Sequence, residues 1–225
     1  MLPCCLDDGK EVSNTFFAIY DGQNGSHVAQ YTEENVHKHL VEEESYKHGR
    51  YELTMKRALL RTDKDLFPLA KSAQRCQLTG RTAIAANAGD SRSVIGVSGK
   101  VKSLSYDHKT NLFQSERARI YAAGGYLEDG RVNGNLLLSR AIGDFIYKKN
   151  SGLDAEEQII TANLDVIVHE ISEEDEFFVI ACDGIWDCLS SREVIDFVRH
   201  EASLGKELAE ISENICDCRF APEAR

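Results

Sequence analysis

Two apolar stretches of this sequence end in the same dipeptide, Asp-Gly. The first reads FFAIYDGQNG, with its dipeptide at Asp21-Gly22, and the second reads FFVIACDG, with its dipeptide at Asp183-Gly184. An Asp directly after a buried strand has its Cα fixed by the sheet while its carboxylate emerges at the sheet's edge. The Gly that follows lets the chain turn away sharply. If the two strands are neighbours, both carboxylates meet at one rim and offer oxygen ligands to a hard cation such as Mg²⁺ or Mn²⁺. The alternative is that each Asp-Gly only turns the chain.

Further carboxylates occupy similar places along the chain. Asp107 lies in SYDHK and Asp144 in SRAIGDF, each after a predicted strand, and Asp187 follows Asp183 by four residues. Asp90, in NAGDSR, is expected to hold a turn through its own backbone. Asp107, Asp144 and Asp187 are therefore additional candidates for a carboxylate site.

The composition indicates a folded protein of one domain. The 225 residues are 42% apolar and 28% charged, as in a globular protein. The formal net charge of −11 argues against nucleic acid as a partner, because phosphates are neutralised by clustered Lys and Arg. The acidic groups either form a solvated surface or gather around a cation.

No apolar run approaches the ~20 residues that span a bilayer, and the first ten residues lack the basic start of a signal peptide, so we expect no membrane association.

The cysteines indicate a reducing compartment. Seven cysteines in a chain without a secretory signal predict free thiols, and hence a cytoplasmic or nuclear protein. Neither Cys4-Cys5 nor Cys216-x-Cys218 has the spacing of a zinc-binding motif. We therefore expect no zinc site, and we expect a monomer.

Short β-like runs and amphipathic helical stretches alternate along the chain. The predicted strands are Thr15–Tyr20, Thr82–Asn87, Ser93–Val97, Val101–Leu104, Asn135–Leu138, Leu164–His169 and Glu176–Cys182. The predicted helices are one that begins near Ser26, and Tyr51–Ala70, Glu116–Ala123, Glu193–His200 and Lys206–Cys216. Turn residues between the second, third and fourth strands favour an antiparallel meander there. Helices before, between and after groups of antiparallel strands indicate one α+β domain and not a doubly wound parallel sheet.

Six segments together resemble the metal-dependent, type 2C family of protein serine/threonine phosphatases. They follow the family's order and read FFAIYDGQNG, ANAGDSR, SLSYDHK, ERARIYAAGG, RVNGNLLLSRAIGDF and DEFFVIACDGIWDCLSSREVIDFV. The resemblance extends from about Phe16 to Val198, which is most of the chain. Each motif alone is weak, but the ordered set is specific.

The resemblance implies an α-β-β-α sandwich, in which two antiparallel sheets lie face to face with helices outside. It also implies two Mg²⁺ or Mn²⁺ ions at one end of the sandwich. Asp21 would bridge the two ions, Gly22 would lend its carbonyl oxygen, and Asp183 would bind one ion. Three further positions match supporting or third-metal residues of the family: Asp107, Asp144 and Asp187.

The family's chemistry uses a water molecule that loses a proton between the two metals and attacks phosphorus in line with the leaving Ser or Thr oxygen. Phosphoproteins are therefore the implied substrates. The family motif DGHGG has a His that is the candidate general acid, and this chain has Gln23 at that position. Gln has no proton to give at neutral pH, so we expect the leaving-group step to be slower by roughly 10²–10⁴-fold. The alternative is an inactive pseudophosphatase that acts as a protein-binding module.

Three parts of the family pattern are missing from the sequence. Residues 1–14 lack the Arg that grips phosphate and the Glu-Asp pair of a preceding strand. Between Cys76 and Asn87 there is room for one strand, where the family has a hairpin, and the chain stops near the start of an expected final strand whose Asp is a metal ligand. We therefore expect a phosphatase-like domain over residues 11–220, incomplete at both ends and lacking outer strands, after a tail at residues 1–10. A fragment that does not fold stably alone is a third alternative.

Overall fold

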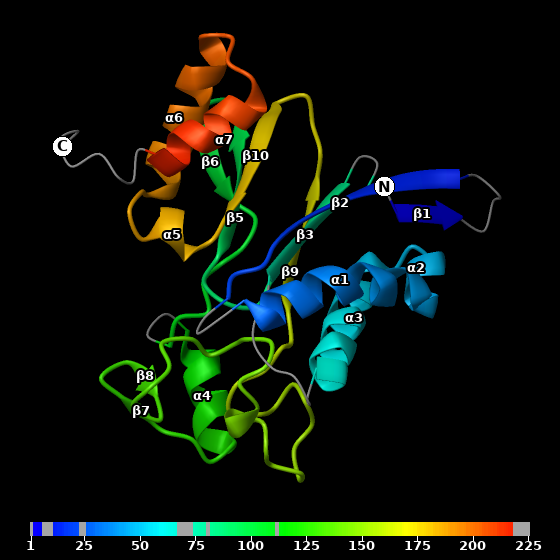
Figure 1. Ribbon diagram of the computed structural model, residues 1–225, viewed down its shortest axis with the longest axis vertical. Helices are drawn as coiled ribbons and strands as arrows, with labels where there is room; N and C mark the ends of the chain where they lie inside the picture. Colours follow the sequence, from blue (N-terminus) through cyan, green and yellow to red (C-terminus); the bar gives the residue numbers. More distant parts are fainter. Residues whose placement is uncertain are drawn as a thin grey trace.

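Two antiparallel β-sheets face each other in the molecule, as Figure 1 shows. The computed structural model describes residues 2–5, 11–22, 26–66, 74–79, 82–110 and 113–217. The five-stranded sheet has the order β1 (Leu2–Cys5), β2 (Glu11–Ile19), β3 (Gln74–Thr79), β4 (Thr82–Asn87) and β9 (Asp165–Glu170). The three-stranded sheet has the order β10 (Asp175–Ala181), β5 (Arg92–Val97) and β6 (Lys100–Ser103). All neighbouring strands in both sheets are antiparallel.

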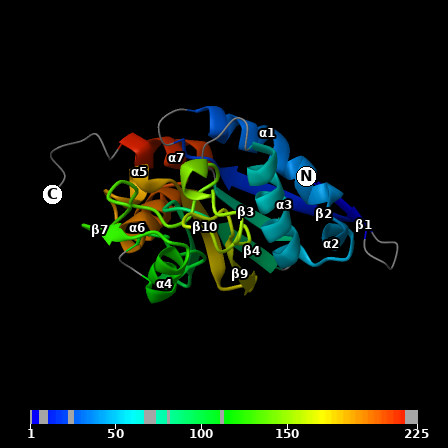
Figure 2. The same ribbon diagram turned by 90° about the horizontal axis from the view of Figure 1, so that it is seen from below.

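Helices cover the outer side of each sheet (Figures 1 and 2). The helices on the five-stranded sheet are α1 (His27–Glu42), α2 (Glu44–Lys47) and α3 (Tyr51–Leu66). The three-stranded sheet carries α6 (Ser191–Ser203) and α7 (Leu208–Asp217), and the short α5 (Asp183–Trp186) follows β10. This layering confirms the predicted α+β class and the α-β-β-α order. None of the described helices is long and apolar enough to cross a membrane.

Apolar side chains at helical spacing attach α1 and α3 to their sheet. Val36 and Leu40 are four residues apart on α1, as are Met55 and Leu59 on α3, and all four are fully buried in one cluster. This i, i+4 spacing places each pair on a single helix face, so that burial of the stripe drives docking of the helix. A separate cluster that includes Val194 packs α6 and α7 on the other sheet.

A third layer of apolar side chains lies between the two sheets. Ala85 of β4 is buried with Ile95 of β5, and Phe178 of β10 packs against them. The rings of Phe17 on β2 and Phe178 lie 5.7 Å apart in an edge-to-face arrangement, which is the favoured geometry for an aromatic pair. This contact holds β2 and β10 together across the sandwich, and both strands continue into an Asp-Gly pair.

A small unit below the sandwich in Figure 1 contains α4 (Gln114–Ala122), the two-stranded sheet of β7 (Leu127–Glu128) and β8 (Arg131–Val132), and the 3₁₀ helix η1 (Phe145–Tyr147). Its core includes Ile120, Val132, Tyr147 and Ile160. As the sequence predicts, α4 ends before Gly124, whose φ of +89° is costly for residues with a Cβ.

The five-stranded sheet contains two strands, β1 and β3, that the sequence did not predict, and the short β7 and β8 were not predicted either. The predicted single strand between Cys76 and Asn87 is wrong, because β3 and β4 form an antiparallel pair there with Thr79 opposite Thr82. β1 pairs with β2 at the edge of the sheet, so the strand that leads into Asp21-Gly22 is preceded by another strand. β1 was missed because LPCC shows no alternation of apolar and polar residues. β3 does alternate from Arg75 to Thr79, and it was missed because only Cys76 and Leu78 in it are apolar. The expected loss of a final strand falls on residues 218–225, which lie outside the described residues.

Two other strand predictions are also wrong. The meander does not form, because β4 pairs with β3 and β9 in one sheet while β5 pairs with β6 and β10 in the other. Gly89, with φ of +138°, lies in the segment that crosses between the sheets. Asn135–Leu138 is not a strand and makes only isolated bridges, from Leu136 to Val132 and from Leu138 to Lys109. Short turns between strands therefore did not identify which sheet each strand joins.

A buried ion cluster connects α4 to the loop before η1. The Glu116 side chain is nearly inaccessible, and its carboxylate accepts hydrogen bonds from Arg140 and Arg119 at 2.7 Å each. Burial alone would raise the pKa of Glu116, but the hydrogen bonds and charge of Arg140, with the charge of Arg119, lower it to about 2. Glu116 is therefore ionised at neutral pH and compensates two arginines that are themselves largely buried.

We expect Glu116→Gln to lower the free energy of unfolding by about 3–5 kcal/mol, because breaking a buried ion pair leaves uncompensated charge in the interior. Urea denaturation followed by circular dichroism measures the change. Glu44→Gln is the matched control, since Glu44 forms an exposed ion pair with Lys47 and its loss should leave the midpoint unchanged. Equal midpoints for Glu116→Gln and wild type would contradict a stabilising role for the cluster.

Candidate metal centre

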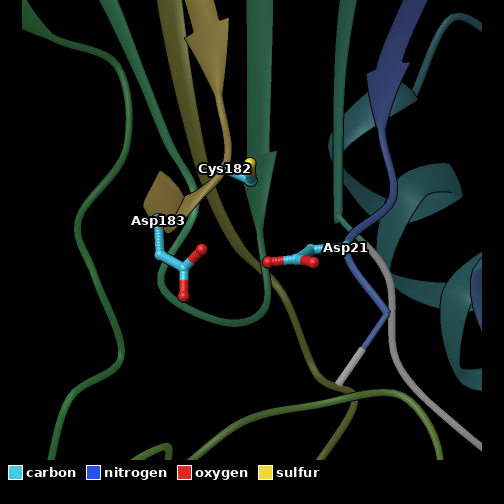
Figure 3. Close-up of side chains that lie close together, drawn as sticks. All are labelled: Asp21, Cys182 and Asp183. Carbon is cyan, nitrogen blue, oxygen red and sulfur yellow. The ribbon is translucent and has the colours of Figure 1, made fainter. Parts of the chain in front are cut away.

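The ends of β2 and β10 bring two carboxylates and a thiol together. Asp21 lies just past β2, and Cys182 and Asp183 lie just past β10. One possible ligand atom from each of these three residues lies within 4.8 Å of the other two. In Figure 3 the carboxylates of Asp21 and Asp183 approach the same space between the strand ends. The two strands are not neighbours in one sheet, which was the condition stated for their carboxylates to meet, but face each other from the two sheets.

The carboxylates in this region repel one another. Burial raises the pKa of Asp183, and the negative charges of Asp21 and Asp187 raise it further. The pKa of Asp90 is raised to about 6, first by burial and then by the charge of Asp183. Such shifts arise where carboxylates are partly buried and are held close to other negative charges. A bound cation would remove this repulsion, so its binding is expected to release protons from these groups.

The donor set suits a hard divalent cation. Carboxylate oxygens are the preferred ligands of Mg²⁺ and Mn²⁺, and Asp21 and Asp183 supply them from two rigid strands. The Gly22 carbonyl lies next in the chain after Asp21, in a half-buried position. Burial raises the pKa of the Cys182 thiol, which therefore stays protonated at neutral pH and is a poor ligand for such ions. The residues present thus fit Mg²⁺ or Mn²⁺ held by Asp21 and Asp183.

Asp107 and Asp187 lie in the same region, and each forms an ion pair with a basic side chain. Asp107 is buried and receives two hydrogen bonds from the Arg92 guanidinium, at 2.9 and 2.8 Å. Asp187 is exposed and lies 3.1 Å from Lys109 Nζ. The Arg92 guanidinium contacts both oxygens of Asp107, so a metal ion there would compete with it, whereas Asp187 is held at one oxygen only. The third-metal role of these two residues stays a prediction.

Asp144 and Gln23 are placed differently. Asp144 precedes η1 with a left-handed backbone, at φ of +50°, and its charge acts on the neighbouring Tyr147 and Lys148. It is not among the three residues whose ligand atoms come together at the ends of β2 and β10. A supporting role for Asp144 stays a prediction. Gln23, the residue at the position of the family His, lies outside the described residues.

Sequence reasoning missed several charged residues of this region. Asp90 receives a hydrogen bond from its own backbone, as predicted for a turn residue, and it also feels the charge of Asp183. The guanidinium of Arg92 lies 5.2 Å from the Trp186 ring centroid and donates to Ser191 Oγ at 3.0 Å. No local pattern identifies such a residue, because its partners are far away in the sequence. The only signal for Arg92 was its position two residues after Asp90 in the motif NAGDSR.

Comparisons with known proteins agree with this architecture. Solved structures that match include a phosphatase from Toxoplasma gondii, with 23% sequence identity, a TM-score of 0.76, and coverage of 92% of this chain and 80% of that chain. Another is a sex-determining protein of Caenorhabditis elegans, with 22% identity and a TM-score of 0.77, over 92% of this chain and 52% of that one. At these identities the similarity establishes the fold alone. The molecule is therefore a two-sheet α+β sandwich with a carboxylate rim between its sheets.

Sequence comparisons establish the family. The family model for protein phosphatase 2C matches residues 2–225, and the chain belongs to this family. Relatives include protein phosphatase 2C homolog 2 of Aspergillus fumigatus, 49% identical over 90% of this chain and 49% of the relative, and homolog 3 of Schizosaccharomyces pombe, 46% identical over 90% of this chain and 50% of the relative. The chain thus spans about half the length of these relatives. The resemblance found in the motifs is confirmed.

Proposed function

We propose that this chain is a metal-dependent protein phosphatase that hydrolyses phosphoserine and phosphothreonine in proteins, with a weakened leaving-group step. The observation that carries the proposal is the convergence of Asp21 and Asp183 from the two sheets, with a raised pKa at Asp183. Membership of the protein phosphatase 2C family supports the reaction class. If the two Asp-Gly pairs only turned the chain, their carboxylates would not need to face each other.

The chain's residues divide the work of the reaction. Asp21 and Asp183 would hold Mg²⁺ or Mn²⁺, and Gly22, the next residue after Asp21, would add its carbonyl oxygen. When bound, such a cation polarises the phosphoryl group and lowers the pKa of a water molecule. Lys109, whose ammonium group lies beside Asp187 and is partly exposed, adds positive charge near the centre that attracts a phosphorylated side chain.

The step that lacks a residue is protonation of the leaving Ser or Thr oxygen. Gln23 occupies the position of the family's candidate general acid, and its amide can donate a hydrogen bond but cannot transfer a proton. Turnover is therefore slow in this proposal. The same substitution supports the second candidate function, a pseudophosphatase that binds phosphoproteins without hydrolysing them.

Hydrolysis of a phosphothreonine peptide by the purified chain tests the proposal. We expect slow phosphate release with millimolar Mn²⁺ and none after the metal is removed with EDTA, because the carboxylates cannot activate water without a cation. Thermal unfolding measured in parallel reports whether the chain folds. A cooperative transition with no Mn²⁺-dependent phosphate release would overturn the enzymatic proposal in favour of the binding module. The absence of any cooperative transition would indicate a fragment that does not fold alone.

A further inference from the structure

A lysine, a histidine and an aspartate form a hydrogen-bonded chain between the two sheets, away from the metal centre. Lys102 Nζ on β6 lies 2.8 Å from His169 Nδ1 on β9, and His169 Nε2 lies 2.8 Å from Asp175 Oδ2 on β10. Asp175 is the first residue of β10, whereas Asp183 follows the end of that strand. The two sites are therefore at opposite ends of β10.

The chemistry of the end groups determines the protonation of the imidazole. An ionised carboxylate only accepts hydrogen bonds, so His169 Nε2 carries the proton and donates it to Asp175. A hydrogen bond from the backbone N–H of Ser172 lowers the pKa of Asp175, which keeps this carboxylate ionised. His169 Nδ1 then carries no proton, and its lone pair accepts a hydrogen bond from Lys102 Nζ. This is the order of groups in which a histidine, oriented by a carboxylate, acts as general base toward a nucleophile.

The three hydrogen-bonded residues differ in solvent exposure, and the difference suits a reactive amine at Lys102. The His169 and Asp175 side chains are 8% and 5% exposed, so their orientation is held by the surrounding protein. Lys102 is exposed to solvent and accessible to a reagent. Within the described part of the chain, Asp175 Oδ1 is buried and has no hydrogen-bond partner, whereas Oδ2 accepts from the Ser172 N–H and contacts His169 Nε2.

We propose that Lys102 is a site of acylation by acyl thioesters, activated by His169 as general base and by Asp175 as the group that positions the imidazole. The Lys102 ammonium first releases one proton to solvent. The neutral amine nitrogen then attacks the thioester carbonyl carbon, a C–N bond forms, and the C–S bond breaks. The second proton lost by this nitrogen passes to His169 Nδ1 and then to the departing thiolate. The products are an amide at Lys102 and a free thiol, and no oxidant or reductant is consumed.

Acetylation by acetyl coenzyme A tests this proposal on the full chain. Lys100 is the internal control, because it lies two residues away on the same strand and is also exposed. Peptide mass spectrometry after timed incubation gives the acetylation rate of each lysine in the same sample. We expect Lys102 to react at least about 10-fold faster than Lys100, a conservative value for general-base assistance.

Two variants separate general-base assistance from a structural role of the same hydrogen bonds. His169→Gln keeps a hydrogen-bonding side chain but removes the base, so the Lys102 rate should fall to that of Lys100. Asp175→Asn should give an intermediate rate, because the imidazole remains but is less well oriented. Thermal unfolding of each variant shows whether it folds. Equal rates for the two lysines in the wild-type protein would overturn the proposal without any variant, and so would an unchanged Lys102 rate in folded His169→Gln.

Discussion

Asp183→Asn is expected to abolish Mn²⁺-dependent hydrolysis of phosphopeptides and to weaken Mn²⁺ binding by at least about 100-fold. Loss of residues that only orient a metal ligand costs 10–100-fold in affinity, and loss of a charged ligand should cost at least as much. Only Asp21 and Asp183 are carboxylates in the group of close ligand atoms at the ends of β2 and β10, so Asn at position 183 removes half of its negative charge. Isothermal titration calorimetry with Mn²⁺ gives the affinity independently of turnover.

Stability provides a second readout for the same variant. The pKa of Asp183 is raised by burial and by the charge of Asp21, so ionised Asp183 is unfavourable in the metal-free protein. Asp183→Asn should therefore leave the metal-free melting temperature unchanged or higher, which distinguishes loss of a ligand from misfolding. Asp196→Asn is the control, since Asp196 is an exposed partner of Arg192 on α6 and should alter neither property. Wild-type affinity for Mn²⁺ in Asp183→Asn would rule out the proposed centre.

Gln23→His is expected to raise the turnover of phosphopeptides by roughly 10²–10⁴-fold at saturating Mn²⁺. The imidazolium can protonate the leaving Ser or Thr oxygen, and general-acid catalysis contributes a factor of this size. The rate should also acquire a decrease at alkaline pH, because a His acid is active only while protonated. Steady-state kinetics between pH 6 and 9 measures both effects.

Gln23→Ala is the matched control for this prediction. It removes the hydrogen-bonding amide without adding an acid, so turnover should not rise. If Gln23→His and Gln23→Ala have the same rate and the same pH profile, protonation of the leaving group does not limit this chain. Mn²⁺ affinity should be the same in both variants, because neither changes Asp21 or Asp183.

Motifs and local patterns determined the family and the presence of most elements. Thr82–Asn87 is a strand with the predicted bounds, and the prediction of a helix from Tyr51 matches the observed α3. The two Asp-Gly endings follow strands, as predicted, and their carboxylates come together. These features are readable in the sequence because each depends on the side-chain spacing or turn residues of one short segment.

Strand pairing could be predicted from the sequence much less well than the presence of individual strands and helices. β3 was missed because only Cys76 and Leu78 of Gln74–Thr79 are apolar, although its backbone pairs with strands on both sides. β4 and β5 were placed in one meander because the segment between them is short, yet they belong to different sheets. Strands pair through backbone hydrogen bonds to segments that are distant in the sequence, so local composition does not determine which strands pair.

The sequence by itself therefore identified candidate site residues such as Asp21 and Asp183, and the tertiary structure decided which side chains lie close together. Asp21 and Asp183 are named by their motifs, but only the face-to-face packing of two sheets brings their carboxylates together. The pairing of Arg92 with Asp107 and the chain from Lys102 through His169 to Asp175 have no sequence signal. The physical reason is that hydrogen bonds and charge interactions depend on distances of a few ångströms in space, which residues far apart in the chain reach only after the fold has formed.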